Sequence, residues 1–216
     1  MDFSVLDFTL VTKLLLLLLI GMGPKLALVP FLEKTKSFDP VTQRAVGRRM
    51  VVTALVTALV LFAFGGLLMR LLHISGGAVA VAGGIILALL AINMVIGHGE
   101  MAVEEHLVVQ GDPTKIAIYP LAVPYLLNPV GITVLIVASD EVASIASVGL
   151  VLGLVLLVGA FDYLIFANID KLAKRLNPTG LVISEVVFGI LLMAVAVQLA
   201  VSGLGSLGII EPSTAH

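Results

Sequence analysis

The sequence contains no cysteine and few charged residues. The absence of cysteine excludes disulfides, thiolate metal sites and thiol redox chemistry. Only 12% of the 216 residues are charged, whereas an average soluble domain has about 25%. The net charge of −2 gives no basis for a nucleic-acid partner. Hydrophobic residues make up 60% of the chain and the mean hydropathy is +1.19, so we expect an integral membrane protein.

Six apolar segments are each close to the roughly 20 residues that a helix needs to cross the hydrocarbon core of a bilayer. They cover about residues 10–32, 50–69, 76–97, 116–139, 142–169 and 180–203. The N-terminus carries Asp2 and Asp7 where a secretory signal has a basic cluster, so we expect the first segment to be retained. The predicted fold class is an all-α membrane protein with six transmembrane helices.

Basic residues are divided unequally between alternate loops. One side of the predicted bundle has nine of them: Lys34, Lys36, Arg44, Arg48, Arg49, Lys115, Lys171, Lys174 and Arg175. The other side has Lys13 and Arg70. Because cytoplasmic loops carry the excess of lysine and arginine, we expect a multi-pass protein of the cytoplasmic (inner or plasma) membrane with both termini outside.

Glycine and proline interrupt two of the apolar segments. Residues 21–25 read Gly-Met-Gly-Pro-Lys, and residues 128–133 read Asn-Pro-Val-Gly-Ile-Thr. Proline removes a helix donor and glycine lets the backbone leave helical geometry, so we predict broken first and fourth helices. Matched breaks at membrane depth are typical of transport sites. The structural alternative is a pair of proline kinks that neighbouring helices stabilise.

The two halves of the chain are related by a constant offset. Pro24 and Pro129 are 105 residues apart. The same offset pairs Arg70 with Arg175, Gly84 with Gly189, Ile85 with Ile190, Leu87 with Leu192, Ala91 with Ala196, and Asn93 with Gln198. Each half has three spans, so the second is inverted relative to the first. We therefore predict one transmembrane domain over residues 1–216, with repeats at about 8–98 and 115–205, a cytoplasmic linker at about 98–114, and one repeat rocking against the other.

The breaks provide the candidate substrate-binding residues. These are Gly23, Pro24, Lys25, Asn128, Pro129, Gly131 and Thr133. The first turn of a half-helix exposes unpaired N–H groups and about half a positive charge, which suits a carboxylate, and Thr133 adds a hydroxyl. We expect the carbonyls freed around Gly21 and Leu127 to suit an ammonium group or a small cation.

Lys25 is the most informative single residue of the breaks. A lysine at membrane depth costs about 2.5–3.5 kcal/mol on insertion scales, so it should face protein or water and have a partner. Three roles are open: binding the substrate carboxylate, acting as a tethered cation, or carrying the coupling proton. The structural alternative is snorkelling toward the interface. Asp162 and Glu185 are its candidate partners and possible coupling residues, although each can equally have a structural role.

Two amides at equivalent positions, Asn93 and Gln198, complete the possible polar or coupling residues. Embedded amides more often hold helices together than bind ligand. The histidines and acidic residues of 98–106 have irregular spacing, so we expect no metal site. No nucleophile–histidine pairing, phosphate loop or metalloprotease motif occurs in the helices, so the sequence does not predict an enzyme.

Several stretches resemble the MarC family of six-helix membrane proteins. Residues 118–124, Ile-Tyr-Pro-Leu-Ala-Val-Pro, and 128–133 are similar to the family's fourth helix, residues 82–87 with 91–94 to its third, and residues 189–192 with 194–198 to its sixth. The first helix departs from the family pattern of Asn-Pro, a small residue and Gly, because here it reads Gly23-Pro24-Lys25-Leu26.

The family includes transporters of small neutral amino acids. The resemblance therefore implies a secondary transporter of glycine, alanine or serine type, coupled to a proton or sodium gradient, with no further cofactor. The alternatives are an exporter of amino acids or other small metabolites and, in a different class, a non-transporting membrane scaffold or stress-related protein. The expected partners are the substrate and the lipid bilayer, and the oligomeric state is left open.

Overall fold

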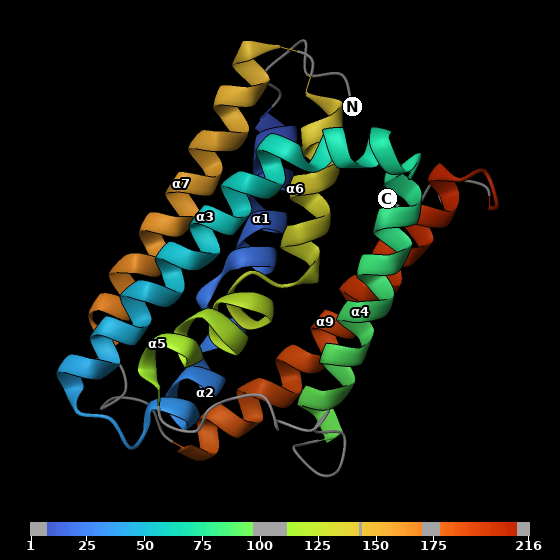
Figure 1. Ribbon diagram of the computed structural model, residues 1–216. Coiled ribbons are helices and arrows are strands. Elements are labelled where there is room, and N and C mark those ends of the chain that lie inside the picture. Colours follow the sequence, from blue (N-terminus) through green and yellow to red (C-terminus); the bar gives the residue numbers. More distant parts are fainter. Residues whose placement is uncertain (1–7, 97–111, 143, 170–177, 211–216) are drawn as a thin grey trace.

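The computed structural model describes residues 8–96, 112–142, 144–169 and 178–210, and every regular element within these ranges is a helix (Figure 1). Five helices are long and apolar enough to cross a membrane, or six if a bent pair forms one span. With the bent pair counted as one span, this agrees with the six apolar segments of the sequence. The all-helical membrane-protein class is therefore confirmed.

The first apolar segment forms two helices, α1 (Phe8–Met22) and α2 (Pro24–Thr35). They are separated by Gly23 alone, whose φ of −73° and ψ of 157° are extended. Proline suits the first position of a helix, where its missing N–H costs no hydrogen bond. Pro24 therefore ends one helix and starts the next.

Helix α3 (Pro40–Leu72) has 33 residues, a length of about 50 Å, which exceeds the roughly 30 Å hydrocarbon core. The Asp39 carboxylate begins it by accepting hydrogen bonds from the backbone N–H groups of Val41 and Thr42. The Thr42 hydroxyl also donates to this carboxylate and lowers the pKa of Asp39. His73 ends the helix in the left-handed conformation, with φ of 53°.

The fourth apolar segment is the most irregular. It comprises α5 (Pro113–Ile116), the wide-turned segment η1 (Ala117–Leu126) and α6 (Pro129–Glu141). Tyr119 and Val123 are extended because each precedes a proline. The part before Leu127 and the part after Asn128 are inclined by 72°.

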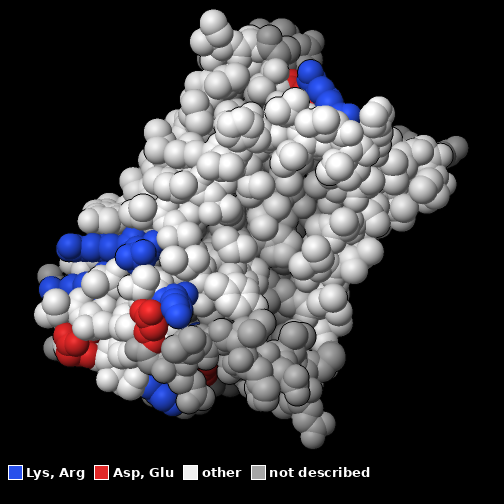
Figure 2. Space-filling view, viewed as in Figure 1, with Lys and Arg blue, Asp and Glu red and all other residues white. Residues whose placement is uncertain are grey.

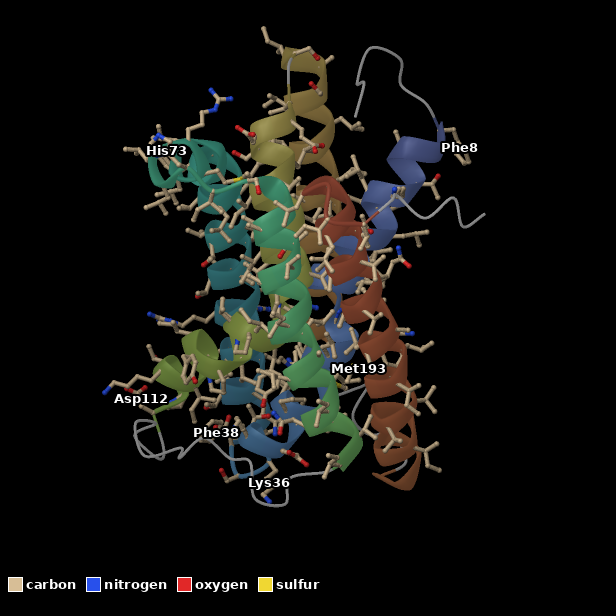
Figure 3. The ribbon with its side chains drawn as sticks, turned by 90° about the vertical axis from the view of Figure 1, so that its right-hand side faces the viewer. Phe8, Lys36, Phe38, His73, Asp112 and Met193 are labelled. Carbon is tan, nitrogen blue, oxygen red and sulfur yellow. The ribbon has the colours of Figure 1, made fainter. Side chains whose placement is uncertain are left out.

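Three more helices lie in the described part of the chain: α4 (Gly76–Ile96), α7 (Ile145–Ala167) and α9 (Pro178–Ser206). The spans alternate in direction (Figure 3). Phe8 and His73 lie at one end of the molecule, and Lys36, Phe38 and Asp112 lie at the other.

Basic side chains gather at the second of these ends, where α2 finishes and α3 begins (Figure 2). They include Lys34, Lys36, Arg44, Arg48 and Arg49. Lys171, Lys174, Arg175 and most of the expected 98–114 linker lie outside the described residues. The asymmetry in the described part has the form that the loop charges predict. We refer to this end as the basic end.

The helices pack as two groups that do not coincide with the two halves of the chain. Helix α4, from the first half, lies along α9, from the second, apart from most of the bundle (Figure 1). A Cβ added to Gly84 would lie 2.7 Å from the Ala196 carbonyl oxygen, and one added to Gly189 would lie 3.1 Å from that of Ala91. The absence of side chains at these glycines permits this contact. The expected division into one half rocking against the other is therefore not how the helices are grouped.

The larger group contains α1, α2, α3, η1, α6 and α7 around one apolar cluster. A smaller cluster joins it to the α4–α9 pair. That cluster contains Leu26 of α2 and Val130 of α6, packed with Leu87, Leu192 and their neighbours. Leu26 and Val130 are each one or two residues past a proline that starts a helix. The region where both proline-containing segments meet α4 and α9 is therefore the junction between the two groups.

Candidate functional site

The Gly23–Pro24 and Asn128–Pro129 segments, far apart in the sequence, are joined by hydrogen bonds. The backbone N–H of Asn128 donates to the Gly21 carbonyl at 2.9 Å, and its side-chain amide donates to the Ile20 carbonyl at 2.6 Å. Proline at 24 removes the helical donor that the Ile20 carbonyl would receive four residues on. Asn128 thus supplies a donor that the first segment lacks.

A close approach of two glycines accompanies these bonds. A Cβ added to Gly21 would overlap the backbone of Gly131, and one added to Gly131 would overlap the carbonyl of Gly21. Only glycine lacks this atom, so the two backbones touch without side chains between them. Both glycines are buried.

The start of α6 is closed by its own cap. The Asn128 side-chain oxygen accepts hydrogen bonds from the N–H groups of Val130, at 2.9 Å, and Gly131, at 3.4 Å. The Asn128 side chain is fully buried. The donors that we expected to be free at this helix start are therefore occupied. We expected a cation or an ammonium group on carbonyls around Gly21 and Leu127, and of these the Gly21 carbonyl accepts the hydrogen bond from Asn128. Asn128 and Pro129 serve here as a joint.

The start of α2 differs, because no side chain caps it. Gly23 has no polar side chain and Pro24 has no N–H group. Lys25 follows at once and is exposed. Its Nζ lies 4.1 Å from the centre of the Phe188 ring of α9, a cation–π contact across the junction between the two helix groups. The N–H groups of this first turn, its positive partial charge and the ammonium group of Lys25 therefore lie together.

Of the two carboxylates suggested as partners of Lys25, the structure describes the side chain of one, Asp162. Asp162 lies in α7, is fully buried, and neither carboxyl oxygen has a hydrogen-bond partner in the part of the chain that the structure describes. Asp162, one of the two candidate partners of Lys25, therefore forms no hydrogen bond with it. The other candidate, Glu185, lies within α9, and its side chain lies outside the described residues.

The remaining predicted residues are divided between the junction and the outer surface. Thr133 is buried in α6 beside α4, where a Cβ added to Gly83 would overlap the Thr133 hydroxyl oxygen. Asn93 and Gln198 are exposed on α4 and α9, and the Gln198 amide donates to Ser202 of its own helix at 3.3 Å. The structure therefore brings Thr133 to the junction and leaves both amides away from it. Among the described residues, no group of three His, Asp or Glu could hold a metal ion.

Sequence reasoning missed two contributors to the junction, Gly83 and Phe188. Gly83 belongs to the Gly-Gly pair of the third segment, and a small residue at that depth was a usable sign of close packing. Phe188 carries no such sign, since one aromatic residue in an apolar helix does not stand out from its neighbours.

Known proteins resemble this chain over most of its length. The model of a family described as MarC family integral membrane protein matches residues 8–207. A protein of Methanocaldococcus jannaschii, named UPF0056 membrane protein, is 30% identical over 184 residues, which cover 85% of this chain and 90% of that protein. A UPF0056 membrane protein of Chlamydia muridarum is 30% identical over 176 residues, covering 82% and 83%. No solved structure matches the chain. With a family model that spans nearly all of the helices, the chain belongs to the MarC family of integral membrane proteins.

Proposed function

We propose that this protein is a secondary transporter of small neutral amino acids, of the glycine, alanine or serine type, in the cytoplasmic membrane. The observation that carries the proposal is the meeting of two interrupted spans at Gly21, Asn128 and Gly131. Irregular backbone within a bilayer is stable only where protein or water satisfies its polar groups. Transporters use such interrupted helices, from both halves of the chain, to build a site near the middle of the membrane.

An inverted repeat is part of this proposal, and the α4–α9 contact supports it. Gly84 and Gly189 are equivalent under the offset of 105 residues, and so are Ala91 and Ala196. Gly84 approaches Ala196, and Gly189 approaches Ala91. Each contact is therefore the counterpart of the other under exchange of the halves. A two-fold axis in the membrane plane would produce such a pair.

The substrate carboxylate binds at the start of α2 in this proposal. Lys25 supplies a positive charge, and the first turn of α2 supplies backbone N–H groups that no side chain caps. Thr133 and Phe188 lie at the same junction and limit the size of the ligand. Alternating access then moves the α4–α9 pair against the remaining helices. The basic end faces the cytoplasm, which places both termini outside.

The test is uptake of labelled glycine and alanine into liposomes containing the purified protein, with an imposed proton or sodium gradient. We expect gradient-driven uptake by the wild type and its loss in Lys25→Gln. Lys13→Gln is the matched control, because Lys13 is an exposed lysine of the same span that lies in α1, ahead of the Gly23 interruption. We expect this control to transport normally.

Other outcomes separate the alternatives. Uptake that occurs only into inside-out vesicles, driven by an outward-directed proton or sodium gradient, would indicate an exporter built on the same architecture. Absence of any flux above empty liposomes, from folded protein and for several small amino acids, would contradict the transport proposal. The scaffold or stress-related alternative would then gain support from specific cross-linking of the protein to another membrane protein in cells.

A further inference from the structure

The buried carboxyl group of Asp162 has no part in the substrate site described above. Its side chain is 0% exposed, and both oxygens are without a hydrogen-bond partner among the described residues. An ionised carboxylate in such a place is very costly, and a group in this position becomes neutral or binds a cation. At this position the Asp162 carboxyl group is therefore expected to carry a proton or to bind a cation.

Asp162 faces the contact between α7 and α3. Close contacts on either side of it along α7 fix this placement: a Cβ on Gly159 would lie 3.0 Å from a methyl carbon of Leu55, and one on Gly47 would lie 3.0 Å from the Phe166 Cβ. These two pairs show that α3 and α7 run antiparallel. Asp162 lies on α7 between the Gly159–Leu55 contact and the Phe166–Gly47 contact. The buried side chains of α3 at that level are apolar: Met50, Val51 and Ala54.

The charged side chains of the neighbouring helices α3 and α1 lie away from Asp162. On α3, Arg48 lies over the ring of Tyr163, 5.9 Å from its centre, and both side chains are exposed. Arg49 is also exposed, and Arg44 lies a further turn toward the start of α3. The one charged residue of α1 is Lys13, near the opposite end of the molecule.

Helix α2 meets α7 through Phe31 and Phe166, and its charged residues lie elsewhere. Its lysines are Lys25, beside Phe188, and Lys34, near the basic end, and its one carboxylate is Glu33. None of these groups forms a hydrogen bond with Asp162 in the described part of the chain.

We propose that Asp162 is the proton-binding group through which this protein is coupled to the proton gradient. This inference rests on the proposed transport function. In each cycle an O–H bond forms on the Asp162 carboxylate from one side of the membrane and breaks toward the other side. A sodium ion needs several oxygen ligands, which the apolar side chains that α3 places at the level of Asp162 do not provide, whereas a proton needs one oxygen.

Two aromatic rings lie on the side of Asp162 that is toward the basic end. Phe166 lies one turn beyond Asp162 on α7 and is fully buried. The ring of Phe31, from α2, lies against it with the ring centres 5.2 Å apart. Phe31 is six residues after Lys25, about 9 Å along the same helix. A movement of α2 therefore changes both the substrate site and the access of water to Asp162, which couples the two.

The first experiment compares two kinds of flux in liposomes for wild type, Asp162→Asn and Asp162→Glu. We expect Asp162→Asn to lose accumulation driven by a pH gradient and to keep exchange of labelled for unlabelled substrate, because exchange needs no net proton movement. Asp162→Glu should retain gradient-driven accumulation. Glu141→Gln is the control, since Glu141 is an exposed carboxylate at the end of α6. Gradient-driven accumulation by Asp162→Asn would overturn the proposal while leaving the transport function intact.

A second measurement tests the proton directly and does not depend on transport. The infrared spectrum of the wild type at neutral pH should contain the carbonyl band of a protonated carboxylic acid without hydrogen bonds, and Asp162→Asn should lack that band. Absence of the band from the wild type over the whole acidic to neutral range would contradict the proposal, even if Asp162→Asn fails to fold. A band present in a protein that transports nothing would contradict the proposed function alone.

These two rings give a third readout. Phe31→Ala should let protons leak down a pH gradient without substrate, because water then reaches Asp162. Phe161→Ala on α7 is the control, since that ring is 48% exposed on the outer surface. A Phe31→Ala variant that is as proton-tight as the control, in protein that still exchanges substrate, would contradict the coupling through α2.

Discussion

The starts of α2 and α6 are a natural comparison, because the same residue type, proline, begins a helix in the middle of a span at both places. At Pro129 the preceding Asn128 fills the cap of α6 and also binds two carbonyl groups of α1. At Pro24 the preceding Gly23 fills nothing, and the following Lys25 is exposed. One start is a closed joint, and the other keeps its donors and adds a charge.

The two helix starts therefore have different roles: the start of α6 stabilises the fold, and the start of α2 is proposed to bind substrate. The joint holds the two interrupted spans together, and Asn128 occupies the N–H groups of Val130 and Gly131 at the start of α6. The start of α2 contributes few internal bonds and retains the groups that bind an anion. We therefore expect substitutions at the joint to act mainly on the free energy of unfolding, and substitutions at the start of α2 to act mainly on substrate binding.

The largest effect on stability is expected for Gly131→Ala. The added methyl group would overlap the Gly21 carbonyl, so the two spans must separate. We expect the free energy of unfolding to fall by roughly 3 kcal/mol, at the upper end for overpacked positions. Gly153→Ala is the matched control, because its Cβ would meet nothing within 4 Å. Thermal unfolding in detergent measures both, and equal midpoints for the two variants would contradict the close contact.

A somewhat smaller loss is expected for Asn128→Ala. It removes the cap of α6 and leaves the buried carbonyl of Ile20 without a donor. We expect a decrease of roughly 2–3 kcal/mol in the free energy of unfolding. Asn93→Ala, at an exposed amide of α4, should change it by less than about 0.5 kcal/mol. If both variants unfold at the temperature of the wild type, Asn128 is not the joint.

Lys25→Gln should have a small effect on the free energy of unfolding and a large effect on uptake, the reverse of what we expect at the joint. Its cation–π contact with Phe188 is exposed, so we expect a change of at most about 1 kcal/mol in the free energy of unfolding. Uptake should nevertheless be lost, as set out for the proposed function. Unfolding curves and uptake measured on one preparation test the two halves of this prediction together. A variant that is strongly destabilised would show that Lys25 has a structural role instead.

The smallest effect is expected for Phe188→Leu. Leucine keeps most of the apolar volume and removes the ring, so the cost should be about 0.5 kcal/mol. Lys25 loses its contact across the junction and becomes less well positioned, so the KM for substrate should rise while the maximal rate changes little. A raised maximal rate with an unchanged KM would show that Phe188 holds the helices and not Lys25.

Much of the fold followed from the sequence. Apolar length predicted the spans, and the proline and glycine residues at 23–24 and 128–131 lie where one helical element ends and the next begins. Hydropathy acts along one chain segment at a time, so it does not determine which helix packs on which. The pairing of α4 with α9 depends on glycines at 84 and 189 meeting alanines far away in the sequence. That information became interpretable only with the helices in place.

The candidate site was predictable in composition but not in its connections. Asn128 was expected at a ligand site, yet its hydrogen bonds to Ile20 and Gly21 make it part of the structure. Such bonds depend on two backbones meeting across a glycine pair, and no local pattern encodes that meeting. Lys25 was expected to have a partner, and its ammonium group lies over a ring of α9. In both cases a three-dimensional neighbour satisfied a group that the sequence had left free.

The most direct test of this account is competition against labelled glycine uptake by unlabelled glycine and by glycinamide, which differs in lacking the carboxylate. If Lys25 and the start of α2 bind the carboxylate, glycine should compete and glycinamide should not. Equal competition by both compounds in the wild type would contradict the assignment of the carboxylate to this start, whatever else the protein transports.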